Sequence, residues 1–281
     1  MRAPLSRNRP RFVVPAPVFV AGFVSVIVLS MKAVCPVHVA ADAFGSAATC
    51  DAVVDGRGVA GSDSEMNERA EDIAEALRAR GRVSVADFDH GEWARARPVR
   101  VTRYWSGAEA PRGRHAEARV VWDEEALSVR FVYLQEEPAV VAGEPRVDRK
   151  TVGLWERDVC EVFVAPDAQR PEKYFEFEAA PTGEWLDLAI VWRPDERETD
   201  WEFRSGMKAA ARVAGKEVTI VMRVPWSAFG RTPRAGERWR VNFFRCAGRD
   251  PDRGYMAWRP TRTPEPSFHV PQAFGELEFK K

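Results

Sequence analysis

Two residues six positions apart, Trp155 and Glu161, combine the side-chain types that a sugar-binding site needs. Tryptophan offers a flat apolar face with one hydrogen-bond donor, and a carboxylate accepts hydrogen bonds from hydroxyl groups. A sugar presents an apolar C–H face and a rim of hydroxyls, so this pair fits a saccharide. The alternative from these residues alone is structural, with Trp155 in the core and Glu161 paired with an arginine.

The residues after Trp155 predict the strand that positions the glutamate. Residues 158–164 are rich in Val and Phe and are followed by Pro166, which is typical of a strand and its end. Strand alternation gives one face Cys160, Val162 and Val164 and the other face Val159, Glu161 and Phe163. Six residues of straight strand span about 20 Å, far more than one sugar ring. Residues 154–157 must therefore form a loop that folds back over the strand if both side chains are to meet one ligand.

Composition limits the classes of function. The chain has 281 residues, enough for one large domain or two small ones, and a formal net charge of zero. Because no excess of positive charge is present, nucleic acid is not expected as a partner. The four cysteines lack the spacing of zinc ligands. A disulfide between Cys160 and Cys246 requires that their two predicted strands be neighbours.

The first 43 residues predict a signal peptide or a membrane anchor. Four arginines within the first 11 residues precede an apolar run over residues 12–29. Such a segment implies a secreted, periplasmic or membrane-anchored extracytoplasmic protein. If translation starts at Met31 instead, the run is never made and the protein is cytoplasmic.

Residues 44–82 predict a linker that contains one short helix. The stretch up to residue 64 is small, polar and rich in Gly and Ala, which is typical of an unstructured connection. Helical spacing follows over residues 65–80, where Met66, Ala70, Ile73 and Leu77 fall on one stripe. We expect this helix to pack at the edge of the domain.

The rest of the chain, residues 83–281, predicts an all-β fold. Alternating runs that fit strands occupy residues 118–122, 127–133, 158–164, 174–178, 185–192, 208–213, 217–224, 239–246 and 276–279. Their connections are of hairpin length, and only single helical turns are expected, near residues 92–96 and 225–230. The pattern indicates an antiparallel β-sandwich with jelly-roll or immunoglobulin-like layers.

Seven pieces of this region, in order, resemble the family 9 carbohydrate-binding modules and their family-9-like relatives. The pieces are Asp-His-Gly-Glu-Trp (89–93), Val-Trp-Asp-Glu-Glu-Ala-Leu (121–127), Leu-Trp-Glu-Arg-Asp-Val-Cys-Glu-Val-Phe (154–163), Tyr-Phe-Glu-Phe-Glu (174–178), Val-Pro-Trp (224–226), Trp-Arg-Val-Asn-Phe-Phe-Arg (239–245) and Ser-Phe-His-Val-Pro-Gln-Ala-Phe-Gly-Glu-Leu (267–277). Together they span most of residues 83–279. No single piece is specific, but their shared order is.

The resemblance implies non-catalytic binding of a sugar between two tryptophans, in the breakdown of plant polysaccharides such as xylan or cellulose. Trp155 matches the first plate, Glu161 the residue that receives the hydroxyls, and Trp258 resembles the second plate. Where xylan- and cellulose-binding members place an arginine in the next strand, this chain has Glu176. The expected ligand is an oligo- or polysaccharide, and neither its identity nor a partner enzyme follows from the resemblance.

Further residues are candidates for the same site. Arg245 is expected to pair with Glu161, and Asn242 to touch the ligand, although alternation puts the two on opposite faces of their strand. Tyr174 and Glu176, with Glu178, would line a concave face or else a solvated one. His269 is expected to be structural. No cofactor is expected except structural calcium, which modules of this family often hold and for which the acidic turn 123–125 is a weak candidate.

Three other functions remain open at this stage. Glu161 and Glu176 would suit a glycoside hydrolase, which needs two carboxylates about 5–9.5 Å apart. A haem module related to these sandwiches would use Met256 or His269 as a ligand. A structural cell-surface domain without a small ligand would bury both Trp155 and Trp258 and leave no groove between them.

Overall fold

The structure, a computed structural model, describes residues 72–193 and 196–281, which contain fourteen strands. All of these residues lie in the second of two compact units, Gly58–Lys281. The predicted targeting segment 1–43 and most of the predicted linker lie outside the described residues. Within the described ranges, no helix is long and apolar enough to cross a membrane.

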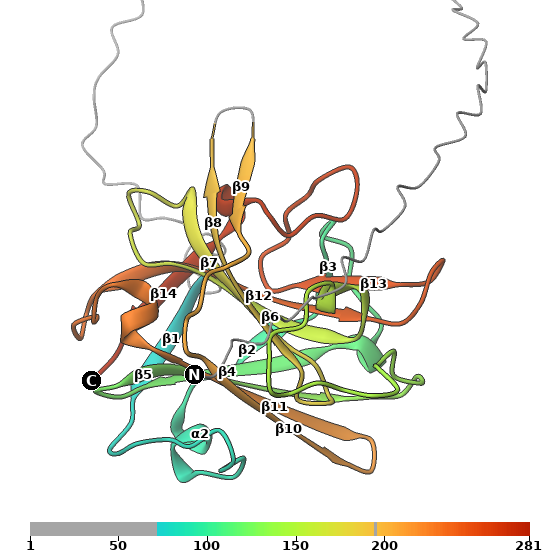
Figure 1. Cartoon of the computed structure of the whole chain (residues 1–281), viewed down its shortest axis with the longest axis horizontal. Helices are drawn as coiled ribbons and strands as arrows, with labels where there is room; N and C mark the ends of the chain where they lie inside the picture. The colour runs from blue at the N-terminus through green and yellow to red at the C-terminus, as the bar shows by residue number, and fades with distance from the viewer. Residues whose placement is uncertain (1–71, 194–195) are drawn as a thin grey trace, which may run out of the picture. The chain divides into compact units, whose positions relative to one another are not determined.

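The elements follow one another along the chain as β-strands with short helical turns between them (Figure 1). The strands are β1 (Ile73–Arg78), β2 (Val99–Val101), β3 (Arg103–Tyr104), β4 (Ala116–Trp122), β5 (Ala126–Leu134), β6 (Val159–Ala165), β7 (Lys173–Ala179), β8 (Trp185–Trp192), β9 (Arg197–Asp200), β10 (Lys208–Ala214), β11 (Glu217–Pro225), β12 (Arg238–Ala247), β13 (Gly254–Ala257) and β14 (Gly275–Phe279). The helical turns are α2 (Gly91–Arg95), η1 (Arg112–Arg114), η2 (Leu154–Glu156), η3 (Trp226–Phe229) and η4 (Pro271–Ala273). The predicted all-β fold is confirmed, and α2 and η3 form where single helical turns were expected.

Hydrogen bonding joins the strands in the order β10-β11-β5-β4-β1-β14-β12-β6-β7-β8-β9. Strand β1 is parallel to both of its neighbours, β4 and β14. The other strand pairs of the described chain are antiparallel. The sheet is therefore mixed at one place only within the described part, where β1 joins its two antiparallel halves.

The two halves pack face to face around one large apolar core. Phe131 of β5 and Phe243 of β12 meet across it, with ring centroids 6.2 Å apart in an edge-to-face arrangement. The core also holds Val120 of β4, Ile220 of β11 and Phe177 of β7. Because each half contributes its inward-facing residues, the arrangement is the predicted β-sandwich.

Strand β6 shows how the second half is buried on both faces. Its residues Cys160, Val162 and Val164 belong to the large core, whereas Val159 and Phe163 belong to a second apolar cluster on the opposite face. That second cluster includes Phe268 and Phe274, which come from the long segment after β13. The predicted alternation is confirmed, and the outer face of β6 is the surface on which the site is built.

The sequence prediction of a helix over residues 65–80 is wrong for the part that the structure describes. Residues 73–78 form β1, in which Ala74 and Ala76 are buried between β4 and β14. An apolar run this short fits either period, and pairing with two neighbouring strands decides between them. The sandwich therefore begins before residue 83, the boundary that the sequence indicated.

The two strand cysteines are both buried and free. Strands β6 and β12 are indeed neighbours, but Cys160 lies opposite Arg245 and Cys246 lies opposite Val159. Cys160 faces the large core and Cys246 the second cluster, so the two thiols lie on opposite faces of the sheet. The conditional disulfide does not form.

Replacing Phe131 by Ala is expected to lower the free energy of unfolding by about 3–5 kcal/mol, because it opens a cavity where the two halves meet. Urea denaturation followed by tryptophan fluorescence measures the change. The control is Val213→Ala on β10, where the valine is 57% exposed and the expected change is within about 0.5 kcal/mol. Equal effects of the two substitutions would contradict this packing.

Candidate functional site

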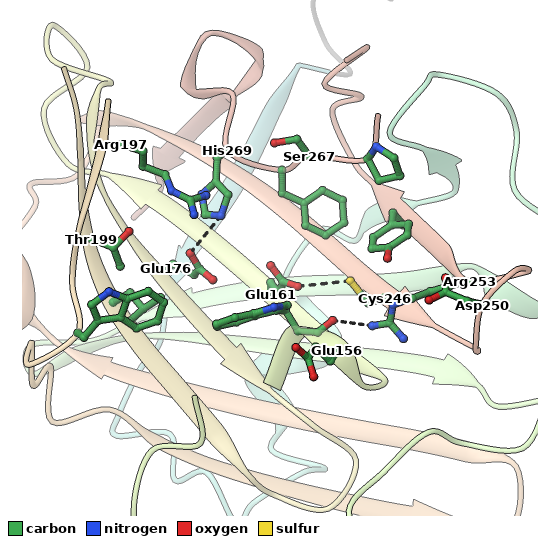
Figure 2. Close-up of a pocket in the computed structure, with 16 residues that line it drawn as sticks. Glu156, Glu161, Glu176, Arg197, Thr199, Cys246, Asp250, Arg253, Ser267 and His269 are labelled. Atoms are coloured by element: carbon green, nitrogen blue, oxygen red, sulfur yellow. Dashed lines mark hydrogen bonds and ion pairs between the residues drawn. The ribbon is translucent and has the colours of Figure 1, made fainter. Parts of the chain in front are cut away.

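A cavity of about 690 Å³ opens over the outer face of β6, β7 and β8 (Figure 2). Strand β9 and the segment before η4 contribute its sides. The lining residues used below are Trp155, Glu161, Glu176, Arg197, Trp201, Cys246, Asp250, Arg253, Tyr255, Phe268 and His269. Its size is that of a small-molecule site, and its lining mixes aromatic faces with charged groups.

The loop that carries Trp155 folds back over β6, as the residue spacing requires. Gly153 has a φ of +84°, a left-handed conformation that suits glycine, and it turns the chain into η2. The guanidinium of Arg253 donates hydrogen bonds to the carbonyls of Trp155 and Arg157, at 2.6 and 2.7 Å. Trp155 and Glu161 consequently line the same cavity.

Trp258 does not pair with Trp155, and the expected face-to-face slot is absent from the described structure. The backbone N–H of Trp258 bonds the carbonyl of Phe243 at 2.9 Å, and its ring lies 5.7 Å from the Phe243 ring, against the large core. Its outer edge borders a different hollow, beside Ile73 of β1. The antiparallel pairing of β13 with β12 fixes this placement, which the sequence resemblance did not anticipate.

Trp201 takes a place beside Trp155 instead. Their ring centroids are 6.0 Å apart and the planes are inclined by 47°, so the two rings touch and form one angled wall. Trp201 follows β9 and is 43% exposed. The sequence analysis missed it, although a tryptophan flanked by acidic residues in a hairpin was the available signal.

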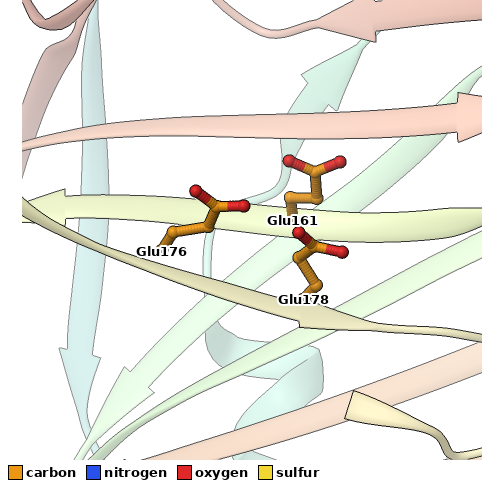
Figure 3. Close-up of side chains that lie close together, drawn as sticks. All are labelled: Glu161, Glu176 and Glu178. Carbon is orange, nitrogen blue, oxygen red and sulfur yellow. The ribbon is translucent and has the colours of Figure 1, made fainter. Parts of the chain in front are cut away.

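Three glutamates lie together at the floor of this region (Figure 3). Glu161 of β6 lies directly across from Glu178 of β7, and Glu176 lies two residues along the same face. One carboxylate oxygen from each falls within 4.8 Å of the others. The three residues are 2, 3 and 0% exposed in the order 161, 176 and 178. Of the three, Glu161 and Glu176 line the cavity and Glu178 lies behind them.

Burial dominates the electrostatics of this cluster. Removal from water raises the pKa of each of the three carboxyl groups. The charge of Glu176 further raises the pKa of Glu161, and both neighbours raise that of Glu178. Since like charges this close in a dry site repel one another, the protonated forms of these carboxyl groups are favoured.

Hydrogen bonds within the described part of the chain do not satisfy this cluster. Oε2 of Glu176 and both carboxyl oxygens of Glu178 have no hydrogen-bond partner there. The thiol of Cys246 lies 3.5 Å from Oε1 of Glu161. No Lys or Arg nitrogen among the described residues forms an ion pair with any of the three.

His269 lies at the cavity wall as a neutral ring. Burial first, and then the charge of Arg197, lowers its pKa to about 3. Its Nδ1 bonds the hydroxyl of Tyr174 at 2.9 Å, and that hydroxyl accepts a hydrogen bond from Trp192 Nε1 at 3.2 Å. The Tyr174 hydroxyl is therefore assigned as the donor to Nδ1. The single N–H of the neutral ring is then on Nε2, which lies 3.9 Å from Oε2 of Glu176. Tyr174 is buried beneath the histidine and does not line the cavity, contrary to the sequence expectation.

Arg245 and Asn242 are also placed differently from the expectation. Arg245 points to the opposite face from Glu161, where it stacks 3.9 Å from the Tyr133 ring centroid and donates to Gln135 at 3.1 Å. Asn242 shares the face of Glu161, but its amide bonds the backbone N–H and carbonyl of Arg259. Both are structural residues in the described fold.

The acidic turn between β4 and β5 does not fit calcium. Both carboxylate oxygens of Asp123 accept hydrogen bonds from Arg223, at 2.6 and 3.0 Å, and Glu125 binds the same guanidinium at 3.0 Å. Burial is the largest single influence and acts to raise the pKa of Asp123, but the hydrogen bonds and charge of Arg223, together with backbone N–H donors of Glu125 and Val83, outweigh it and the pKa is lowered. Because Arg223 already neutralises these oxygens, the acidic residues of the turn form ion pairs that join the β4–β5 hairpin to β11.

Comparison with known proteins gives one family match and several similar structures. The family model described as carbohydrate family 9 binding domain-like matches residues 87–281. A protein of Arthroderma benhamiae described as an extracellular protein is 24% identical over 178 residues, which is 57% of this chain and 77% of that protein.

Three solved structures share the fold. A Bacteroides uniformis protein proposed to bind carbohydrate has a TM-score of 0.58 at 18% identity and covers 74% of this chain and 99% of its own. A family 9 carbohydrate-binding module from Caldicellulosiruptor kristjanssonii, in complex with glucose, has a TM-score of 0.54 at 13% identity. The match covers 73% of this chain and 95% of that module. Its complex with cellotriose has a TM-score of 0.53 at 12% identity, covering 74% and 93%.

Glu178→Gln is expected to increase stability in mildly alkaline solution. Each raised carboxyl pKa gives stability that is fully present below about pH 4.3, the unfolded value, and is lost as pH rises through the folded value. The free energy of unfolding of the natural chain should therefore fall as the pH rises above about 4.3, whereas that of the variant should fall less, so that the variant is more stable in mildly alkaline solution by about 1–3 kcal/mol.

Urea denaturation across this pH range measures the effect. Glu124→Gln is the matched control, since the Glu124 side chain is 88% exposed and lies at the hairpin turn. If the profile of Glu178→Gln runs parallel to those of the control and the natural chain, the assignment of buried protons to this cluster is wrong.

Proposed function

Because the chain belongs to the carbohydrate family 9 binding domain-like family, we propose that its cavity binds a saccharide and does not catalyse a reaction on it. The observation that carries the proposal is that Trp155 and Glu161 line one cavity of about 690 Å³. An aromatic plate and a carboxyl group six residues apart in the chain thus face the same space. The family relationship and this juxtaposition support each other, since each was reached from different evidence.

The aromatic wall supplies the apolar part of the proposed recognition. Trp155 and Trp201 touch at an angle and present two adjoining faces to the cavity. A pyranose would lay its C–H face on one of them and its edge on the other. By analogy with base–aromatic stacking, each plate contributes about 1–3 kcal/mol. Tyr255 and Phe268 border the other side of the cavity.

The floor supplies the polar part. A protonated Glu161 has one O–H donor and a carbonyl acceptor, so it is able to donate a hydrogen bond to a sugar hydroxyl or accept one from it. Glu176 lies beside it, and Arg253 and Asp250 lie at the rim. Two plates and a few hydrogen bonds, less the cost of association, correspond to dissociation constants from micromolar to millimolar.

The proposed ligand class is an oligosaccharide of the plant-polysaccharide type, cellulose-like or xylan-like. Its support is the pair of similar structures that hold glucose and cellotriose. An extracellular place of action is proposed as well, supported by the similar fungal protein described as extracellular. The apolar segment 12–29 fits that location.

Trp155→Ala is expected to weaken binding of cellotriose or xylotriose at least tenfold, because it removes the stacking plate that lies over the floor. Isothermal titration calorimetry with the full chain measures the loss. Trp258→Ala is the matched control, since Trp258 lies outside the cavity and its loss should leave the affinity within about twofold. Circular dichroism melts confirm that both variants are folded.

Two results would count against the proposal. Equal affinities of Trp155→Ala and the natural chain would remove this cavity from recognition. Release of reducing sugar from the same oligosaccharides, abolished in Glu161→Gln, would show a glycoside hydrolase instead of a binding module.

A further inference from the structure

The lining of the cavity has more acidic than basic side chains. Among the described residues that line it, Glu156, Glu161, Glu176 and Asp250 are acidic, and Arg197 and Arg253 are basic. Glu178 adds a fifth carboxyl group directly behind Glu161. His269 does not restore the balance, because its ring is neutral.

The basic side chains do not pair with the floor. Arg253 directs its donors to backbone carbonyls of Gly248, Trp155 and Arg157. Arg197 comes from an exposed strand and makes no ion pair with Glu176 in the described structure. Arg245, the nearest buried arginine on the neighbouring strand, points to the other face of the sheet.

Two of the floor groups are buried and without hydrogen-bond partners in the described chain. Oε2 of Glu176 is one such atom, and Glu176 itself lines the cavity. Both oxygens of Glu178 are the others. A buried acceptor without a hydrogen bond costs free energy. A ligand that brings a donor to this oxygen therefore gains binding free energy by forming the missing hydrogen bond.

We propose that the saccharide bound here carries a free amino group, and that its ammonium binds between Glu161 and Glu176 at the cavity floor. The proposal rests on the proposed sugar-binding function and specifies the class of sugar. An ammonium group offers three N–H donors and one positive charge, and the floor offers an unpartnered oxygen of Glu176 and carboxyl groups that form no ion pair with a Lys or Arg of the described chain. The ring would remain on the aromatic wall of Trp155 and Trp201.

Charge balance accompanies this binding. When the ammonium enters, the carboxyl groups that face it give up a proton to solvent, since the positive charge replaces the bound proton. Glu178 does not line the cavity, so it keeps its proton. Binding should thus release protons for an amino sugar and none for a neutral sugar.

The test compares sugars that differ only in one substituent: glucose, glucosamine, N-acetylglucosamine and 6-amino-6-deoxyglucose, each also as the corresponding β-1,4 trimer where one exists. Calorimetry at about pH 6, where a sugar amine is protonated, is run in two buffers of different ionisation enthalpy. At least one amino sugar should bind about tenfold tighter than glucose and N-acetylglucosamine, with proton release.

Glu176→Gln should reduce the preference for the amino sugar over glucose to below about threefold, because it removes one of the two carboxyl groups that face the ammonium. Glu124→Gln, at the exposed hairpin turn, is the control and should keep the full preference. Gln has nearly the same shape as Glu, so the variant tests charge without opening the cavity.

The outcomes separate the two proposals. If cellotriose binds at Trp155 as tightly as the amino sugars do, the amino-sugar assignment is overturned and the sugar-binding function remains. If no sugar binds, the proposed function itself fails. Tight binding of calcium or manganese alone, lost in Glu178→Gln and without any preference for amino sugars, would also overturn the assignment.

Discussion

Burial of both faces of β6, β7 and β12 is the constraint on which the rest of the structure depends. One face of these strands closes the large core, and the second apolar cluster covers part of the other. A strand buried on both sides normally carries apolar residues throughout. Here the outer face changes within a few residues from Phe163 to Glu161, so apolar packing and the acidic floor share one surface. The loops that cover the apolar part also wall the cavity.

Local pattern was enough to predict nine of the fourteen strands, and it predicted that Trp155 and Glu161 face one cavity. The alternation of β6 placed Glu161 on the face opposite Cys160, Val162 and Val164, and the length of the strand required a loop that folds Trp155 back over Glu161. Both inferences depend on backbone geometry within about ten residues. The same kind of reasoning failed for β1, because the helix and strand periods are indistinguishable in a short alanine-rich run and pairing with β4 and β14 decides.

The partners of these residues were beyond the sequence because they depend on strand register and loop paths. Alternation within each strand predicts which residues share a face with Glu161 and which share a face with Glu178. Only the register of β6 with β7 places these two glutamates directly across from each other. Trp258 was expected in the cavity on the basis of resemblance, and β13 directs it to the core instead. Trp201 arrives through the β8–β9 hairpin, whose pairing places the residue after β9 beside η2.

The acidic floor is difficult to explain as a contribution to stability. Three carboxyl groups in mutual contact lose hydration and repel one another, and apolar residues of similar size would pack the same space at lower cost. Two other buried acids are neutralised by a basic side chain: Arg223 pairs with Asp123, and Lys150 with Asp187 at 2.9 Å. The three glutamates of the floor lack such a partner among the described residues, and they adjoin the cavity that Trp155 and Trp201 line. Residues that are unfavourable for folding are expected at functional sites, and this floor is both unfavourable for folding and open to a ligand.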